Sequence, residues 1–181
     1  ATFVFASAAI VYGVFAEAID NDSLINADTP YGKSKWFAEE LIKMSGVKYC
    51  ILRIGGVFGL DGPNHLSLNR TITDVLNQIS PQLHGSGNAQ RNYIYVWDVA
   101  VHVENAINHD IQGTHLLAGN EKMTIHTMME EICHTLSSDI KPNKQFGNEA
   151  KNQLIESSES FPGARSFQEA LQDIKFKAGV N

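Results

Sequence analysis

Two continuous runs of apolar and β-prone residues bracket a helical segment near the start of the chain. They cover residues 2–7 and residues 47–54. Uninterrupted runs of this kind are typical of strands that are buried on both faces of a parallel sheet. Between them, Thr29 and Pro30 form a helix start, and apolar residues then recur at helical spacing as far as Gly46. The order strand, helix, strand predicts a right-handed crossover in an α/β fold.

The remaining chain continues this alternation, with more turns between the elements. A glycine-rich loop follows residue 54 and a polar turn lies around residues 85–87. Further elements are expected as helices at about 66–79, 97–108 and 166–174, a helix capped by Thr124 and ending near Leu136, and strands at 93–96 and 113–118.

Composition excludes several classes of function. The 181 residues carry a net charge of -6 and contain no lysine- or arginine-rich run, so binding to nucleic acid is not expected. The longest apolar stretch, residues 2–18, is interrupted by Ser7, Gly13 and Glu17, which argues against a membrane span and against a secretory leader. The length suits one domain, or one domain with a subdomain.

The two cysteines indicate a reducing compartment. Cys50 lies in an apolar run and Cys133 in a helical pattern, and together they make neither a disulfide framework nor a metal-ligand spacing. We therefore expect a cytoplasmic protein.

Tyr31 and Lys35 form the strongest candidate site for chemistry. They stand four residues apart in the first turns of the helix that Pro30 begins, so both side chains lie on one helix face. A nearby ammonium group favours the phenolate, which makes such a tyrosine suitable as an acid or base in carbinol and carbonyl chemistry. The spacing alone also fits an exposed helix on which the two residues are incidental.

Four ordered segments supply the context for this pair. They are FASAAIVYG at residues 5–13, YGKSK at 31–35, LRIGGVFG at 52–59 and QRNYIYVWDVA at 90–100. In this order they resemble the extended short-chain dehydrogenase/reductase family, which contains the NAD-dependent sugar-nucleotide epimerases and dehydratases. The resemblance implies the C-terminal half of a doubly wound, Rossmann-type parallel sheet with a small mixed substrate-binding subdomain. It assigns residues 1–54 and 93–118 to the first part, and 55–92 and 119–181 to the second.

The resemblance also implies roles for single residues. Tyr31 corresponds to the catalytic acid/base, and Lys35 to the residue that contacts the nicotinamide ribose of NAD or NADP and favours the ionised tyrosine. Arg91 corresponds to a contact with the substrate diphosphate, although the same residue also fits a solvated strand start. The substrate-binding candidates after the glycine–proline turn are Asn64, His65 and Leu66.

Two positions depart from the family pattern. Relatives carry Ser or Thr where this chain has Ala8, and that hydroxyl hydrogen-bonds the reacting oxygen. Ser7 is a candidate replacement in catalysis and cofactor contact, but only if the strand end is bulged, because neighbouring strand residues point to opposite faces. Relatives also often carry Asn at the position of Gly56.

The family's glycine-rich phosphate loop is expected to lie before Ala1, together with its helix and the acidic residue that reads the ribose. We therefore expect this chain to be a fragment that binds NAD or NADP poorly by itself. The expected protein is an epimerase, dehydratase or reductase that acts on a nucleotide-sugar substrate and forms a homodimer through the helix of Tyr31. The alternative is a non-catalytic relative that keeps the fold for binding or assembly.

One further histidine pattern has a structural explanation. His126, Glu130 and His134 recur at four-residue spacing, which could present ligands to zinc, but a solvated helix face explains them better. No metal site is predicted. The methionines on the same segment are expected to pack in the core; they are Met123, Met128 and Met129.

Overall fold

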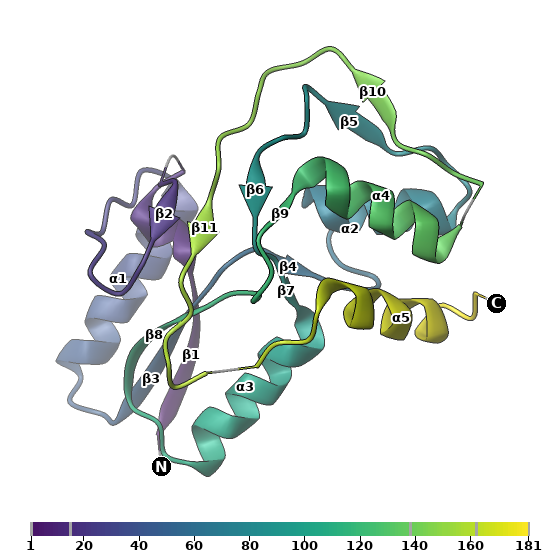
Figure 1. Cartoon of the computed structure of the whole chain (residues 1–181). Coiled ribbons are helices and arrows are strands. Elements are labelled where there is room, and N and C mark those ends of the chain that lie inside the picture. Colours follow the sequence, from purple (N-terminus) through teal and green to yellow (C-terminus); the bar gives the residue numbers. More distant parts are fainter. Residues whose placement is uncertain (1, 15, 138, 162, 181) are drawn as a thin grey trace.

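A three-stranded parallel sheet forms the base of the protein (Figure 1). The computed structural model describes residues 2–14, 16–137, 139–161 and 163–180. The strands are β1 (Phe3–Ala8), β3 (Tyr49–Ile54) and β8 (Gly113–Leu117), in the order β1-β3-β8. Both pairings are parallel, which confirms the predicted α/β class.

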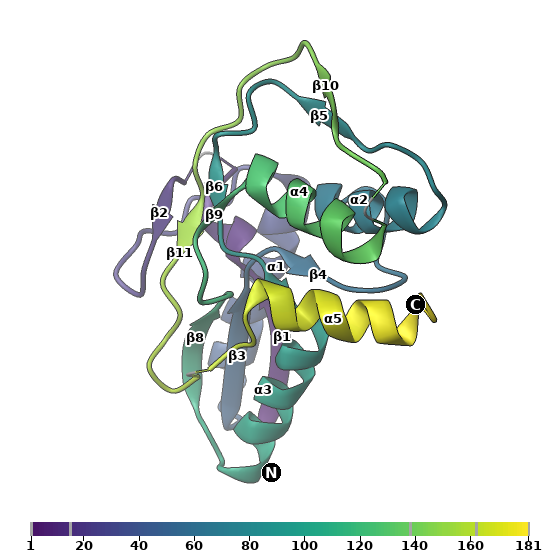
Figure 2. The same cartoon turned by 45° about the vertical axis from the view of Figure 1, so that its right-hand side comes forward.

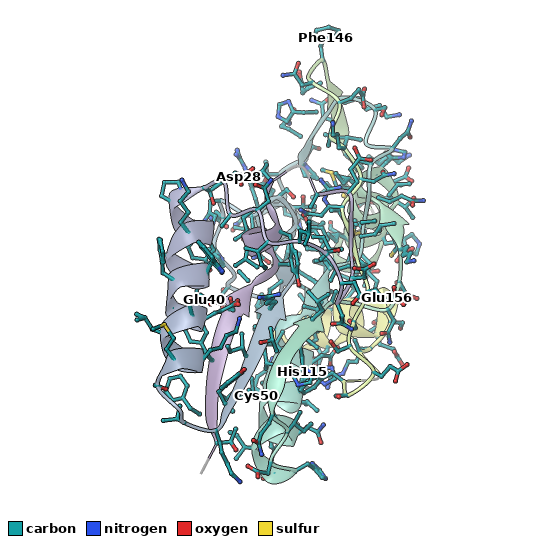
Figure 3. All side chains as sticks on the ribbon, turned by 90° about the vertical axis from the view of Figure 1, so that its left-hand side faces the viewer. Asp28, Glu40, Cys50, His115, Phe146 and Glu156 are labelled. Atoms are coloured by element: carbon teal, nitrogen blue, oxygen red, sulfur yellow. The ribbon has the colours of Figure 1, made fainter. Side chains whose placement is uncertain are left out.

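Helices cover the two faces of this sheet (Figure 2). Helix α1 (Pro30–Met44) packs on one face, and α3 (Val96–Asn108) packs on the other. Figure 3 shows the sheet from the side of α1, with Glu40 on that helix and His115 on β8. Because side chains alternate along a strand, β3 sends Arg53 toward α1 and Leu52 into the apolar cluster that includes Val99 and Val103 of α3.

The start of α1 follows the predicted signals. The Thr29 side chain accepts a hydrogen bond from the Gly32 amide at 3.0 Å, and Pro30 occupies the first helical position. A Cβ atom at Gly32 would lie 3.0 Å from the carbonyl oxygen of Ile10. The helix therefore begins in close contact with the segment that follows β1, here the short 3₁₀ helix η1 (Ala9–Tyr12).

A second apolar cluster lies beside the sheet. It is built from α2 (Ser67–Leu76), α4 (Ile125–Leu136) and α5 (Phe167–Lys177), with β4 (Val57–Phe58) and β7 (Ile94–Tyr95) between them and the sheet. Met128 and Met129 are buried and Met123 packs against this cluster, as predicted. Strands β4 and β7 pair in parallel with each other.

Short strand pairs complete the fold and were not predicted. They are β2 (Ala18–Ile19) with β11 (Leu154–Ile155), β5 (Gln82–His84) with β10 (Asn143–Gln145), and β6 (Gln90–Arg91) with β9 (Met123–Thr124). Strands of two or three residues are too short to show an alternating pattern. The β5–β10 pair extends away from the sheet, and Phe146 marks the tip of this extension (Figure 3).

Several predicted boundaries were wrong. The strand that was predicted to begin at residue 47 begins at Tyr49. Helix α2 was predicted to extend to about residue 79 but ends at residue 76, because Gln78 adopts a positive φ of 61° that a helix does not accommodate. Strand β1 is not buried on both faces. It pairs only with β3 among the described strands, and Phe3 remains half exposed.

A buried ion pair fastens α1 to the sheet. Glu39 of α1 is fully buried, and its carboxylate accepts hydrogen bonds from Arg53 Nη2 at 2.7 Å and from Arg53 Nε at 3.1 Å. Ser7 Oγ donates to the same carboxylate, and Arg53 Nη1 donates to the Tyr12 hydroxyl at 2.6 Å. One charge pair thus joins α1, β1, β3 and η1.

The environment of Arg53 keeps it charged. Burial acts to lower the pKa of Arg53, but the hydrogen bonds and negative charge of Glu39 more than offset burial, so the pKa lies above its usual value. The guanidinium therefore remains charged inside the protein, where its bidentate hydrogen bonds to Glu39 compensate for the loss of water.

None of the helices in the described part of the chain is long and apolar enough to cross a membrane.

Replacing Glu39 by Gln should destabilise the protein strongly, because it leaves the Arg53 charge buried without its counterion. The expected loss is about 3–5 kcal/mol in the free energy of unfolding, measured by urea denaturation. Glu40→Gln is the matched control, since Glu40 sits on the same helix in an exposed pair with Lys43 and should cost less than about 1 kcal/mol. Equal losses of unfolding free energy in the two variants would show that the buried pair stabilises the protein no more than the exposed pair does.

Candidate functional site

The largest cavity relevant to the predicted site opens at the carboxyl ends of β1 and β3. Its volume is about 640 Å³. In parallel α/β sheets this edge is where ligands bind. The lining is mostly apolar and comes from six separate stretches of chain: Ala8, Ala9 and Ile10; Tyr31; Ile54, Gly55, Gly56 and Val57; His65 and Leu66; Tyr93; and Gln153 with Ile155.

Tyr31 lines this cavity from the first turn of α1. Its side chain is 58% exposed. The Lys35 ammonium lies 5.7 Å from the centroid of the Tyr31 ring, so the two side chains share one helix face as predicted. Lys35 Nζ also donates a hydrogen bond to the carbonyl oxygen of Ala6 at 2.9 Å, and it lies 5.1 Å from the centroid of the Phe5 ring. Strand β1 thereby holds the ammonium beside the phenol.

Ser7 lies on the other side of β1 from this cavity. The β1–β3 register is regular through Ser7 opposite Arg53 and Ala8 opposite Ile54, so the strand end has no bulge. The Ser7 hydroxyl is buried and donates to Glu39. The expectation that Ser7 replaces the missing hydroxyl is therefore corrected, because the residue beside Tyr31 in the cavity is Ala8.

Arg91 lies in a small recess that opens beside the cavity. The recess shares Gly56 and Tyr93 with the larger cavity, as well as Gln153 and Ile155. Arg91 Nη1 donates to the carbonyl oxygen of Gln90 at 2.9 Å and to that of Lys151. The guanidinium is thus tethered by backbone carbonyls, in contrast to a freely solvated arginine at a strand start.

The three candidates after the glycine–proline turn divide between two cavities. His65 and Leu66 line the large cavity, whereas Asn64 lines a second cavity of about 390 Å³ that His65 also borders. The Asn64 side-chain oxygen accepts a hydrogen bond from the Thr73 hydroxyl at 3.1 Å.

The second cavity runs between α2, β5 and α4. Its polar lining includes Arg70, which is 3.7 Å from Asp74, and His84. These residues were not predicted as site residues, because an arginine on an amphipathic helix and a histidine in a short strand belong to no recognisable motif. Gln153 was missed for the same reason, since it lies in a polar stretch that shows no period.

The histidine pattern on α4 does not form a metal centre in the part of the chain that the structure describes. His126 Nε2 lies 3.5 Å from Glu130 Oε1. No group of three His, Cys, Asp or Glu side chains among the described residues is arranged to hold a metal ion.

The arrangement brings together a phenol, an ammonium group and an arginine around a mostly apolar cavity. A phenol beside an ammonium group is suited to proton exchange with a hydroxyl or carbonyl group, and a tethered guanidinium is suited to a phosphate. Together with the parallel sheet, these features define a Rossmann-type α/β protein with a candidate ligand site at the carboxyl edge of its strands.

Comparison with known proteins identifies the family. The family model for the NAD dependent epimerase/dehydratase family matches residues 1–119. The chain therefore belongs to this family, which confirms the resemblance found from the sequence motifs.

Two curated relatives are similar in sequence. A putative UDP-glucose 4-epimerase of Methanocaldococcus jannaschii is 31% identical over 125 residues, which is 65% of this chain and 41% of the relative. An uncharacterized UDP-glucose epimerase of Bacillus subtilis is 28% identical over 130 residues, which is 68% of this chain and 41% of the relative. The matched region thus spans less than half the length of either relative.

Solved structures share the fold over almost the whole chain. A UDP-N-acetylglucosamine 4-epimerase from Methanobrevibacter ruminantium, in complex with UDP-N-acetylmuramic acid, matches with a TM-score of 0.83 and 25% identity, over 98% of this chain and 63% of that one. A UDP-glucuronic acid 4-epimerase from Bacillus cereus, in complex with NAD, matches with a TM-score of 0.82 and 20% identity, over 98% of this chain and 61% of that one.

Proposed function

We propose that this chain is part of an epimerase, dehydratase or reductase that acts on a nucleotide sugar and uses NAD or NADP. The observation that carries the proposal is the Tyr31 phenol on the wall of the large cavity, with the Lys35 ammonium 5.7 Å from its ring. Family membership and the nucleotide-sugar complexes of solved relatives support it.

In the proposed reaction, Tyr31 accepts and returns the proton of the sugar hydroxyl group. As a carbinol of the sugar becomes a carbonyl, the phenolate oxygen of Tyr31 takes the hydroxyl proton, and it returns this proton when the carbonyl is reduced. When bound, a nicotinamide would supply the hydride chemistry that balances this proton transfer. Lys35 holds a positive charge beside the phenol and keeps its own position through the hydrogen bond to Ala6.

The residues present fit a nicotinamide cofactor at this edge of the sheet. Tyr31 and Lys35 would contact the ribose and nicotinamide end, because both side chains lie on the helix face above the end of β1. In this proposal residues 1–54 and 93–118 belong to the cofactor-binding part, and residues 55–92 and 119–181 hold the substrate.

The substrate would extend across both cavities. The sugar would lie beside Tyr31, the diphosphate beside Arg91, and the nucleoside toward the second cavity with Asn64. Support comes from shared lining residues, since His65 borders both cavities and Tyr93 borders the larger cavity and the Arg91 recess.

The proposed enzyme is a homodimer that pairs through α1. An apolar stripe runs along the outer face of this helix, where Phe37, Leu41 and Met44 are 59%, 68% and 82% exposed. Residues three and four apart lie on one helix face, so the stripe is continuous. A cytoplasmic location is supported by Cys50 and Cys133, which are both free and buried.

Tyr31→Phe should lower turnover of the nucleotide sugar by about 100-fold or more, because it removes the group that exchanges the proton. Binding of cofactor and substrate should stay within about twofold of the wild type, since the ring remains. The measurement is single-turnover kinetics of the full-length protein, together with calorimetric binding. Tyr49→Phe is the control, because Tyr49 lies at the end of β3 that is farther from the cavity. Unchanged turnover in Tyr31→Phe would show that Tyr31 is not the group that exchanges the proton.

Ala8→Ser should raise turnover by about tenfold if the site lacks only a hydrogen-bond donor to the reacting oxygen. Ala8 lines the cavity with Tyr31, so a hydroxyl at this position faces the proposed reaction centre. Ala8→Val adds bulk without a donor and is the matched control. A steady-state comparison of the two variants decides the point, and no gain in Ala8→Ser would mean that another group already donates.

Leu41→Glu should convert the dimer to a monomer, because it places two charges at the centre of the apolar stripe. Light scattering after size-exclusion chromatography measures the mass directly. Phe176→Glu is the control, since Phe176 is 83% exposed on α5, outside the proposed interface. A wild-type protein that is already monomeric would contradict the proposed pairing.

A further inference from the structure

The double glycine that follows β3 allows two other side chains to pack closely against the backbone of the cavity wall. A Cβ atom at Gly56 would lie 2.4 Å from two ring carbons of Tyr93, and a Cβ atom at Gly55 would lie 2.8 Å from Cδ1 of Ile155. Real Cβ atoms do not approach other carbons so closely. The volume that side chains at these two positions would need is therefore filled by Tyr93 and Ile155.

The backbone of Tyr93 is fixed on both sides. A Cβ atom at Gly119 would lie 2.1 Å from the Tyr93 carbonyl oxygen, so only glycine permits this approach. The amide of Ile94 donates to the carbonyl oxygen of Gly56 at 2.8 Å. These constraints hold the Tyr93 ring over Gly56, which is the kind of preorganisation that a ligand site requires.

The buried Asn92 fixes the part of the cavity wall that Ile155 forms. Its side-chain amide donates to the carbonyl oxygens of Gly119 at 2.9 Å and Ile155 at 2.7 Å, and its side-chain oxygen accepts from the Ile155 amide at 3.0 Å. Two neighbouring residues thus have separate tasks, since Asn92 ties the walls together and Tyr93 forms one of them.

Tyr93 stands between the two spaces that the proposed substrate would occupy. It lines the large cavity and also the recess that holds Arg91. The side chain is half buried, and its hydroxyl makes no hydrogen bond to another described residue. A fixed aromatic ring with an unused hydroxyl provides both apolar contact and a hydrogen bond for a polar ligand.

The charge of the lining restricts the ligand. Among the described residues, the large cavity is lined by no Asp, Glu, Lys or Arg side chain. The two cations beside the cavity, Lys35 and Arg91, do not line it and already donate to backbone carbonyl oxygens. Burying a carboxylate without a cationic partner is costly, so a sugar acid would fit this lining less well than a sugar with hydroxyl or acetamido groups.

We infer that Tyr93, seated over Gly56, is a specificity-determining residue that holds a neutral sugar against its ring and hydroxyl. This inference rests on the proposed function, because it assumes that the ligand of the large cavity is the sugar of a nucleotide sugar. It predicts that Tyr93 contributes to the binding of the sugar and contributes nothing to the binding of the nucleotide alone.

The test is calorimetric binding of four ligands to the full-length protein: UDP, UDP-glucose, UDP-N-acetylglucosamine and UDP-glucuronate. In the wild type, one of the neutral sugars should bind about tenfold more tightly than UDP, and UDP-glucuronate should gain nothing over UDP. Tyr93→Ala should remove this gain and leave UDP unchanged. Tyr93→Phe should retain part of it, because the ring stays and the hydroxyl is lost.

A double-mutant cycle separates contact from misfolding. Gly56→Ala should weaken sugar binding when Tyr93 is present, because the new methyl group displaces the ring, and should have no effect in the Tyr93→Ala background. Thermal melting of each variant checks that the fold is retained. Additive effects, a gain that survives Tyr93→Ala, preferential binding of UDP-glucuronate, or no binding of any UDP-sugar would each overturn the inference.

The two proposals fail in different ways. If the neutral sugar loses its binding gain in Tyr93→Ala but the wild type turns over no nucleotide sugar, the proposed reaction is wrong and the assignment of Tyr93 stands. If the wild type turns over a nucleotide sugar and Tyr93→Ala keeps the wild-type binding gain, the reaction stands and the assignment is wrong.

Discussion

The ion pair between Glu39 and Arg53 sets the position of the helix that carries Tyr31 and Lys35. It is buried between α1 and the sheet, and it engages Ser7 of β1 and Tyr12 of η1 as well. Because Tyr31 and Lys35 belong to the same helix as Glu39, the pair fixes where their side chains stand relative to the end of β1. A purely apolar contact would tolerate sliding of the helix, whereas a bidentate pair accepts one register.

The sequence predicted the features that rest on periodicity and caps. The parallel strands, the helix from Pro30 and the shared face of Tyr31 and Lys35 all follow from local rules, and each agrees with the structure. The short strand pairs were missed because they depend on contacts between distant segments. Strand β11, for example, pairs with β2 across more than 130 residues, which no local pattern encodes.

The candidate site was predicted only in part, for the same reason. Tyr31, His65 and Leu66 share one cavity and Arg91 adjoins it, but Ser7 faces Glu39 and Asn64 lies in the second cavity. Because the register of β1 is regular, Ser7 points away from the cavity and toward Glu39. Tyr93 was not predicted as a site residue, because its position depends on its close approach to Gly56 and Gly119. The sequence alone does not show which residues approach these two glycines.

The wall formed around Asn92 also affects how the site assembles during folding. Asn92 and Ile155 are 63 residues apart, and their hydrogen bonds close one side of the cavity. Contacts of such long sequence separation form late, because the chain entropy lost in closing the loop is recovered only when both ends are in place. The pairing of β3 with β8 joins residues that are equally far apart in the chain, such as Cys50 and Gly113. The cavity wall and the sheet therefore face the same cost of loop closure, and a probe placed in the cavity would report the assembly of both.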